Sequence, residues 1–151
     1  MTAGFCTTPI GVRMNFLIDL DPKHGVIRLT VTSAVVDLRC AEECYTRLKR
    51  VSEGGPYAAI YDLSTVTGTT LSVDLVRSYA RRPPSIPLRK THVVVGKEPH
   101  IYGFARIFQM CREFWAATNL KFVHSLDEAY EMVGVGPEDF TQRLFPKIYG
   151  T

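Results

Sequence analysis

One run of residues, 57–82, constrains the fold of this chain more than any other. It begins with an apolar segment at 57–63, passes through a hydroxyl-rich turn at 64–70, and continues as an amphipathic pattern up to Pro83 and Pro84. A short apolar run is typical of a buried strand, and an apolar stripe repeating with the helical period is typical of a surface helix. Proline lacks the amide hydrogen and ends such a helix. The run therefore predicts a strand, a turn and a helix, the repeating unit of an α/β protein.

The same alternation extends along most of the chain. Two alternating segments, 14–21 and 26–32, are joined by a Pro-Lys-His-Gly turn signal and predict a hairpin. The segments that follow are a helix at 37–51, the strand and helix of 57–82, a strand at 91–96, a helix at 101–118, a strand at 120–124 and a short helix up to 133. The order β-β-α-β-α-β-α-β-α predicts an α/β fold with a mixed, mostly parallel sheet of about five strands and four to five helices.

Length and element placement predict a single domain. A chain of 151 residues is of ordinary domain size and can bury roughly two-thirds of its unfolded surface. We expect residues 1–13 to form a mobile leader, residues 14–134 to form the α/β domain, and residues 135–151 to add a C-terminal helical extension.

Composition and charge exclude several classes of protein. The chain is 46% hydrophobic and 22% charged, which is typical of a globular protein and not of a disordered one. Its net charge is only +3, and the Lys and Arg residues form short scattered clusters, so we expect no nucleic-acid partner. No apolar run approaches the ~20 residues that span a bilayer, and no secretory signal is recognisable. We therefore expect a cytoplasmic protein without an integral membrane segment.

The reactive side chains form no familiar catalytic or metal-binding motif. The four cysteines include no CxxC pair, and Cys40 and Cys44, which share a helix face, have no third ligand nearby. Gly-x-Ser-x-Gly is absent, and no nucleophile accompanies His92 and His124, which we expect near one another at the sheet. We therefore expect no enzyme activity, no cofactor and no metal. A pocket where both histidines and Asp62 converged would instead favour a small enzyme.

Four stretches of the sequence together resemble a known family. They are Tyr-Asp-Leu-Ser-Thr-Val-Thr at 61–67, Val-Val-Val-Gly at 93–96, Phe-Ala-Arg-Ile-Phe-Gln-Met at 104–110 and Phe-Val-His-Ser-Leu-Asp-Glu-Ala at 122–129. Over residues 14–133 the chain resembles the STAS domains, the SpoIIAA-like anti-sigma-factor antagonists, and most closely the small bacterial STAS/SEC14-type proteins. The resemblance implies the SpoIIAA-like fold and a non-catalytic regulatory or protein-interaction module. The alternative that it implies is a SEC14-like binder of a lipid or other small apolar ligand, held beneath the long helix.

The phosphorylation motif of that family differs in this sequence. Anti-sigma-factor antagonists carry Asp-Ser-Ser-Gly at the start of the second helix, and a partner kinase phosphorylates the first serine. Aligned without gaps from Asp62, the four positions read Thr-Leu-Ser-Val, and Leu71 stands at the phosphoacceptor position. The candidates for an interaction turn or a displaced phosphoacceptor are Asp62, Ser64, Thr69, Thr70 and Ser72. Helix capping and turn hydrogen bonds explain the same side chains without a partner.

The predicted helix at 101–118 is the second candidate region. Its apolar side chains cover roughly half of the circumference, more than the ~100° stripe that one contact face needs. The residues proposed for a second contact are Phe104, Ile107, Phe108, Cys111 and Trp115. Deep burial within the chain explains this pattern, and so does contact with an apolar ligand, an unidentified protein partner or a second copy. Among the partners we expect a homodimer, because two-fold dimers are the commonest oligomers.

Overall fold

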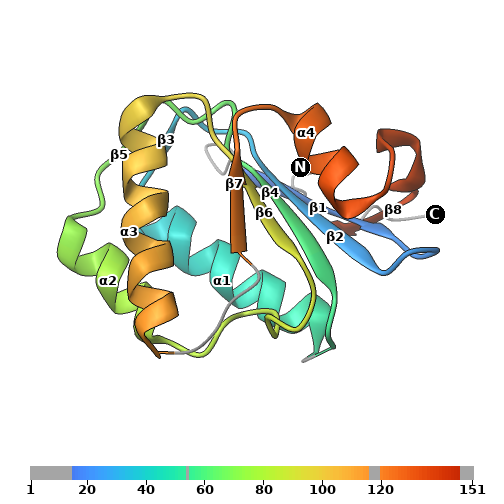
Figure 1. The fold of residues 1–151 in the computed structure, drawn as a ribbon, viewed down its shortest axis with the longest axis horizontal. Coiled ribbons are helices and arrows are strands. Elements are labelled where there is room, and N and C mark those ends of the chain that lie inside the picture. Colours follow the sequence, from blue (N-terminus) through green and yellow to red (C-terminus); the bar gives the residue numbers. More distant parts are fainter. Residues whose placement is uncertain (1–14, 54, 116–119, 147–151) are drawn as a thin grey trace, which may run out of the picture.

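A six-stranded sheet forms the centre of the fold in the computed structural model, which describes residues 15–53, 55–115 and 120–146 (Figure 1). Its strands are β1 (Phe16–Asp21), β2 (Val26–Val31), β4 (Ala58–Asp62), β6 (His92–Val95), β7 (Leu120–Val123) and β8 (Gln142–Phe145). They lie in the order β7-β6-β4-β2-β1-β8. Strands β2, β4, β6 and β7 are parallel, and β1 is antiparallel to both of its neighbours. The predicted α/β fold with a mixed, mostly parallel sheet is confirmed, with one strand more than expected.

Four α-helices of the described chain cover the two faces of this sheet. They are α1 (Leu38–Ser52), α2 (Val73–Arg81), α3 (Pro99–Trp115) and α4 (Leu126–Val133). Helices α1, α2 and α3 lie on one face and α4 lies on the other (Figure 1). Because consecutive parallel strands are neighbours, right-handed crossovers bring the first three helices to the same face. The chain then crosses the opposite face through α4 and returns to the far edge as β8.

Alternation along the strands divides the apolar side chains between two cores. The core toward α1 includes Phe16, Ile18, Ile27, Leu29 and Val31 from the hairpin. The core toward α4 includes Val26, Ile60, Val93 and Val95 from the sheet and Ala129 and Tyr130 from the helix. Alternating residues of a strand point to opposite faces, so the central strands β2 and β4 contribute to both cores.

Local signals account for the ends of the helices. The Asp37 side chain accepts a hydrogen bond from the amide of Cys40, and α1 begins there. Ser125 accepts from the amide of Glu128 at the start of α4, and Gly134 ends that helix with φ of 83°. A left-handed conformation at this position favours glycine, as the sequence predicts.

The predicted helical extension at 135–151 is wrong over the residues described. Pro137–Asp139 forms one turn of 3-10 helix, η2, and β8 then pairs antiparallel with β1. The edge of β1 offers backbone groups that need partners, and the ring of Phe145 stacks on that of Phe16 at 4.8 Å. Pairing with β1 therefore satisfies the backbone and covers the core. The leader predicted at 1–13 lies outside the described residues.

Candidate functional site

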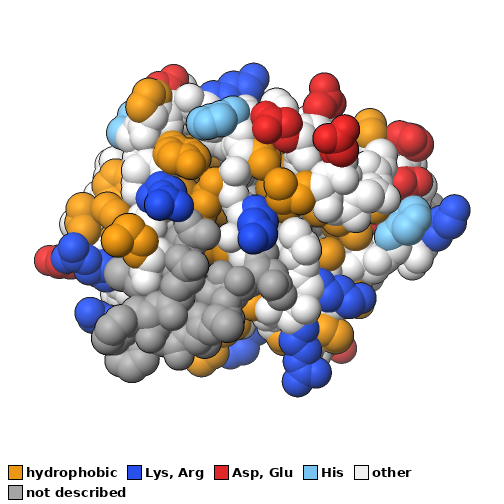
Figure 2. Space-filling model, viewed as in Figure 1, with side chains coloured by type: hydrophobic (Ala, Val, Ile, Leu, Met, Phe, Trp, Pro, Cys, Tyr) orange, Lys and Arg blue, Asp and Glu red, His pale blue; other side chains and the backbone are white. Residues whose placement is uncertain are grey.

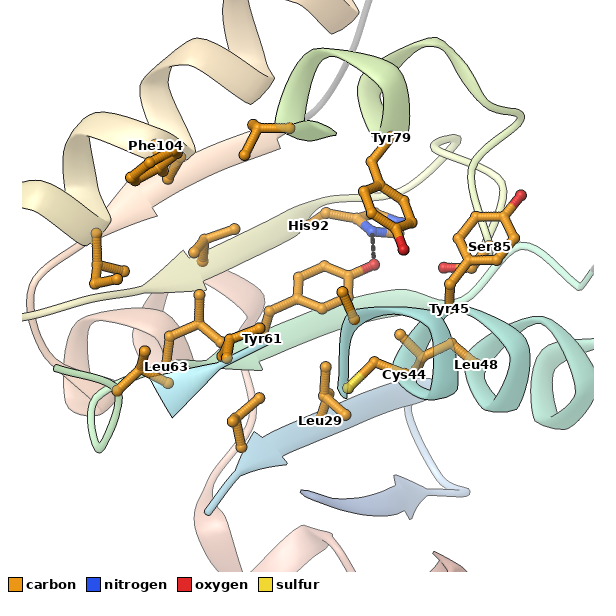
Figure 3. A pocket seen from close by; sticks show the side chains of 18 of the residues that line it. Leu29, Cys44, Tyr45, Leu48, Tyr61, Leu63, Tyr79, Ser85, His92 and Phe104 are labelled. Carbon is orange, nitrogen blue, oxygen red and sulfur yellow. Dashed lines mark hydrogen bonds between the residues drawn. The ribbon is translucent and has the colours of Figure 1, made fainter. Parts of the chain in front are cut away.

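A cavity of about 330 Å³ lies between the sheet and the helices α1, α2 and α3. Ligand-binding cavities in proteins begin at about 300 Å³, so the volume is sufficient for a small molecule. Strands β2, β4, β6 and β7 supply its floor, the three helices supply its roof, and the loop 84–88 closes one side. Figure 3 shows side chains from the strands and from the helices pointing into the same space.

The walls of the cavity are mostly aliphatic and aromatic. From the strands come Leu29, Val31, Tyr61, His92, Val94, Leu120 and Phe122, and from the helices come Cys40, Ala41, Cys44, Tyr45, Leu48, Val76, Tyr79, Ile101, Phe104 and Ala105. The cavity is open partly because small side chains, among them Ala41, Cys44 and Ala105, face it from the roof. Apolar walls with a few placed polar groups are the usual composition of a ligand pocket.

Tyr61 and His92 form a polar pair on the floor of this cavity (Figure 3). The Tyr61 hydroxyl and Nδ1 of His92 are 2.8 Å apart, and the two rings stack with their centroids separated by 5.7 Å. The residues lie on the adjacent parallel strands β4 and β6, where Ala59 is the direct partner of His92. Tyr61 is therefore a diagonal neighbour, two residues along the strand, and its side chain points to the same face.

His92 is neutral at physiological pH because it is fully buried. Burial lowers the pKa of its imidazole to about 4, and the nearby carbonyls of Pro87 and Tyr57 oppose this shift only in part. Neither carbonyl lies in hydrogen-bonding geometry, and Nε2 makes no hydrogen bond with the described residues. An imidazole that resists protonation holds the Tyr61 hydroxyl on the cavity floor without adding charge.

The two cysteines of α1 lie against the cavity, and the hydrogen bond between them lowers the pKa of the Cys40 thiol. Cys40 is buried and Cys44 is half-buried, and both line the cavity from the roof. A hydrogen bond with Cys40, together with burial, raises the pKa of the Cys44 thiol. A protonated thiol packs like a small apolar side chain. The two cysteines therefore contribute to the apolar wall of the cavity.

A cluster of four side chains closes the gap between α1 and the end of α2. The Tyr79 hydroxyl donates to Glu42 at 2.7 Å, and the guanidinium of Arg82 donates to the same carboxylate at 2.8 Å. Arg82 also lies over the rings of Tyr79 and Tyr45, at 4.5 and 5.2 Å from their centroids. Tyr45 donates to the carbonyl of Pro83 at 2.6 Å. Because Tyr45 and Tyr79 line the cavity and are half-buried, this clamp forms part of the cavity wall between α1 and α2.

The ion pair within this clamp is held by mutual hydrogen bonding. The hydrogen bonds from Arg82 and then from Tyr79 hold the pKa of Glu42 below its usual value. Burial and the hydrogen bond to Glu42 raise the pKa of Tyr79 to about 12. Glu42 is thus a carboxylate and Tyr79 a neutral hydroxyl donor at any pH near neutrality, which keeps the clamp in its closed arrangement.

The candidate turn at 62–72 is held together by its own polar side chains. Asp62 accepts from the amide of Ser64 at 3.0 Å and from the Ser64 hydroxyl. The Thr69 hydroxyl donates to the carbonyl of Val36 at 2.6 Å, which joins the short parallel strands β3 (Val35–Val36) and β5 (Gly68–Thr69). Ser72 caps α2 by accepting from the amide of Leu75 at 3.1 Å. The side chain of Thr70 is exposed.

The candidate face of α3 is only partly described. Phe104 lines the cavity, and Ile107 is half-buried but does not line it. The side chains of Phe108, Cys111 and Trp115 lie outside the described part of the structure. The homodimer expected through this face stays a prediction.

The three residues whose convergence in one pocket would favour a small enzyme, namely His92, His124 and Asp62, do not lie together. His92 faces the cavity at the start of β6, whereas Asp62 ends β4 and points to the opposite face of the sheet. His124 follows β7, and its ring stacks on Tyr102 with 5.2 Å between the centroids. The expected proximity of His92 and His124 is therefore wrong, because His92 begins β6 and His124 follows the far end of its parallel neighbour β7, so the two residues lie at opposite ends of these strands.

A separate polar cluster lies at the hairpin turn. Asp21, His24 and Asp139 bring their ligand atoms within 4.8 Å of one another. The Asp21 carboxylate already accepts from the amides of Lys23 and His24 and contacts the His24 ring at 2.7 Å. Hydrogen bonds within the turn are therefore sufficient to explain why these side chains lie together.

Sequence reasoning missed most of the cavity lining. From the sequence, Tyr61 is placed only in the family-like stretch 61–67, and none of Tyr45, Tyr79 and Glu42 is singled out. The one available signal was the amphipathic spacing of 38–51, whose apolar face includes Ala41, Cys44 and Leu48. That spacing indicates an inward face, but it does not distinguish a filled core from an open one.

Comparison with known proteins adds no family assignment, since no family model matches the chain and no curated protein matches its sequence. In the described part of the chain, no helix combines the length and apolarity that crossing a membrane requires. On the face shown in Figure 2, the described Lys and Arg side chains are dispersed among other residues. The proposal for the function of this protein therefore rests on the geometry of the cavity.

Proposed function

We propose that this protein binds a small apolar molecule in the cavity between the sheet and α1–α3. The observation that carries the proposal is a cavity of about 330 Å³ with almost wholly apolar walls. An engineered apolar cavity of ~150 Å³ binds benzene, and this larger, partly open cavity with apolar walls has room for a larger apolar molecule. Ile101, Phe104 and Ala105 of α3 form part of the roof, which agrees with the SEC14-like alternative drawn from the sequence.

The alternative of a regulatory module acting through the turn at 62–72 has less support. Ser64, Thr69 and Ser72 already make hydrogen bonds that the turn and α2 need. A phosphate on Ser64 or Thr69 would remove the proton that the hydroxyl donates to Asp62 or to Val36, and Leu71 offers no hydroxyl. Thr70 and Ser72 are the exposed hydroxyls of the candidate set, and Ser72 already caps α2.

The test is a binding titration with a neutral apolar fluorophore, N-phenyl-1-naphthylamine. We expect a saturable rise in fluorescence with one site per chain, because the probe leaves water for an apolar wall. Native mass spectrometry of freshly purified protein supplies a second reading, in which a bound apolar mass that is lost on unfolding supports the proposal. A probe signal that stays linear with concentration, with no bound mass, would overturn it.

A further inference from the structure

Resting on this proposed function, we infer that the cavity selects ligands that carry no charge, and that ionised amphiphiles such as free carboxylates and amines are excluded from it. The inference concerns the chemical class of the ligand and goes beyond the apolar character of the walls. It depends on which ionisable groups face the cavity and on which charges lie at its boundary.

No Asp, Glu, Lys or Arg occurs among the described residues that line the cavity. An ionised ligand would therefore meet no opposite charge inside. The side chains that can ionise and do face it are His92, the thiols Cys40 and Cys44, and the phenols Tyr45, Tyr61 and Tyr79. His92 has its pKa lowered to about 4, and Tyr79 has its pKa raised to about 12, so burial and hydrogen bonding hold both groups neutral.

One pair of charges lies beside the cavity and is compensated internally. Glu42 and Arg82 contact one another at 2.8 Å in the clamp between α1 and α2. A ligand carboxylate would have to displace Glu42 from Arg82, and a ligand ammonium would have to displace Arg82 from Glu42. In both cases a charge of the protein would lose its partner, so this pair does not recruit either type of ion.

The polar part of the cavity floor suits a neutral substituent. His92 is fully buried and its Nδ1 is paired with Tyr61, so the polar side chain that a ligand can reach there is the half-buried phenol of Tyr61, which suits a neutral hydroxyl or carbonyl group. An ion placed there would lose its hydration without a counter-charge, which is the costliest arrangement for a buried group. The structure thus favours compact hydrophobic alcohols, phenols, ketones or hydrocarbons.

The test compares four rigid ligands of one size: naphthalene, naphthol, naphthoate and naphthylmethylamine. Each is titrated against the full chain with bound N-phenyl-1-naphthylamine, at about pH 7.5, where the acid and the aliphatic amine are ionised. We expect naphthalene and naphthol to displace the probe at concentrations at least about tenfold lower than either ion needs. Lowering the pH to about 5.5 should improve the affinity of naphthoate and leave that of naphthol unchanged, because the neutral acid becomes more abundant.

The possible results separate the inference from the function on which it rests. If naphthalene binds and naphthoate or the amine binds equally well at about pH 7.5, charge exclusion is overturned while ligand binding stands. The same conclusion follows if the affinity of naphthoate does not rise as the pH falls. If none of the four displaces the probe and the probe itself does not saturate, the proposed function and the inference fail together.

Discussion

The hydroxyl of Tyr61 and Nδ1 of His92 lie 2.8 Å apart on adjacent parallel strands, at the floor of an apolar cavity. Because His92 is fully buried, this contact places a neutral hydrogen-bonded pair where the surrounding groups are hydrocarbon. A buried polar group costs little when it is paired and much when its partner is removed. The pair is therefore a structural element as well as the polar part of the candidate site.

The first prediction concerns the coupling within this pair. Tyr61→Phe should lower the free energy of unfolding by about 1–3 kcal/mol, because Nδ1 of His92 then lacks its partner. The double variant Tyr61→Phe/His92→Phe should cost less than the sum of the two single variants, since both polar groups are then removed. Urea unfolding of the four proteins gives the coupling energy, and strictly additive effects would show that the hydrogen bond contributes nothing.

The second prediction is a pH dependence of stability that arises from His92. Its pKa is about 4 in the folded chain and about 6.5 in an unfolded one, so the unfolded chain binds more protons between these values. Stability should therefore fall as the pH drops from 6.5 toward 4, by about 3 kcal/mol from this residue. His92→Gln does not titrate and retains a hydrogen-bonding partner for Tyr61. Its stability should decline less over this range, and parallel decline of the two proteins would contradict the assignment.

A third prediction concerns the buried ion cluster that joins β8 to the sheet. Asp19 is buried and accepts from Arg28 at 3.2 Å and from Arg143 at 2.5 Å, and Arg28 also donates to Tyr130. Asp19→Ala should destabilise the chain by about 3 kcal/mol, because the largely buried guanidinium of Arg28 loses its counter-charge. Arg143→Ala should cost clearly less, since Asp19 keeps Arg28. Thermal or urea unfolding measures the loss of stability in each variant. Equal losses in Asp19→Ala and Arg143→Ala would argue against the cluster as described.

The fourth prediction concerns the clamp between α1 and α2. Glu42→Ala removes the acceptor shared by Tyr79 and Arg82. We therefore expect N-phenyl-1-naphthylamine to enter the cavity about threefold faster or more, which is the effect of losing at least one hydrogen bond that holds the clamp together. Glu43→Ala is the matched control, because Glu43 pairs with Arg39 on the exposed face of α1. Stopped-flow fluorescence measures both rates. Equal association rates for the two variants would place the entrance elsewhere.

The elements that the sequence predicts correctly are those determined by local patterns. Phe16, Ile18 and Leu20 alternate in the first strand, and all three pack in the core toward α1. The turn before Val26 and the caps at Ser72 and Gly134 likewise depend on a few neighbouring residues. Strand β8 was missed because its stability comes from pairing with β1, more than a hundred residues away, and no local signal reports that partner.

The candidate site was harder to predict than the fold. Local reasoning correctly assigned Asp62 to hydrogen bonds with its own turn and Ser72 to a cap. The contact between Tyr61 and His92 depends on the register of two parallel strands, which neither strand specifies alone. The cavity itself is the volume that side chains from separate elements leave unfilled, and the small residues Ala41, Cys44 and Ala105 reveal it only once the helices are placed.

The most direct measurement is the affinity of N-phenyl-1-naphthylamine for two variants that carry the same substitution. Val94→Phe places a larger side chain in the cavity floor, whereas Val35→Phe makes the same change on β3, where the side chain is 49% exposed and does not line the cavity. We predict that Val94→Phe, with its fold verified by circular dichroism, weakens binding by about tenfold or more, because the probe loses both volume and contacts. Val35→Phe should bind as the original chain does. Equal affinities for all three proteins would contradict binding in the cavity.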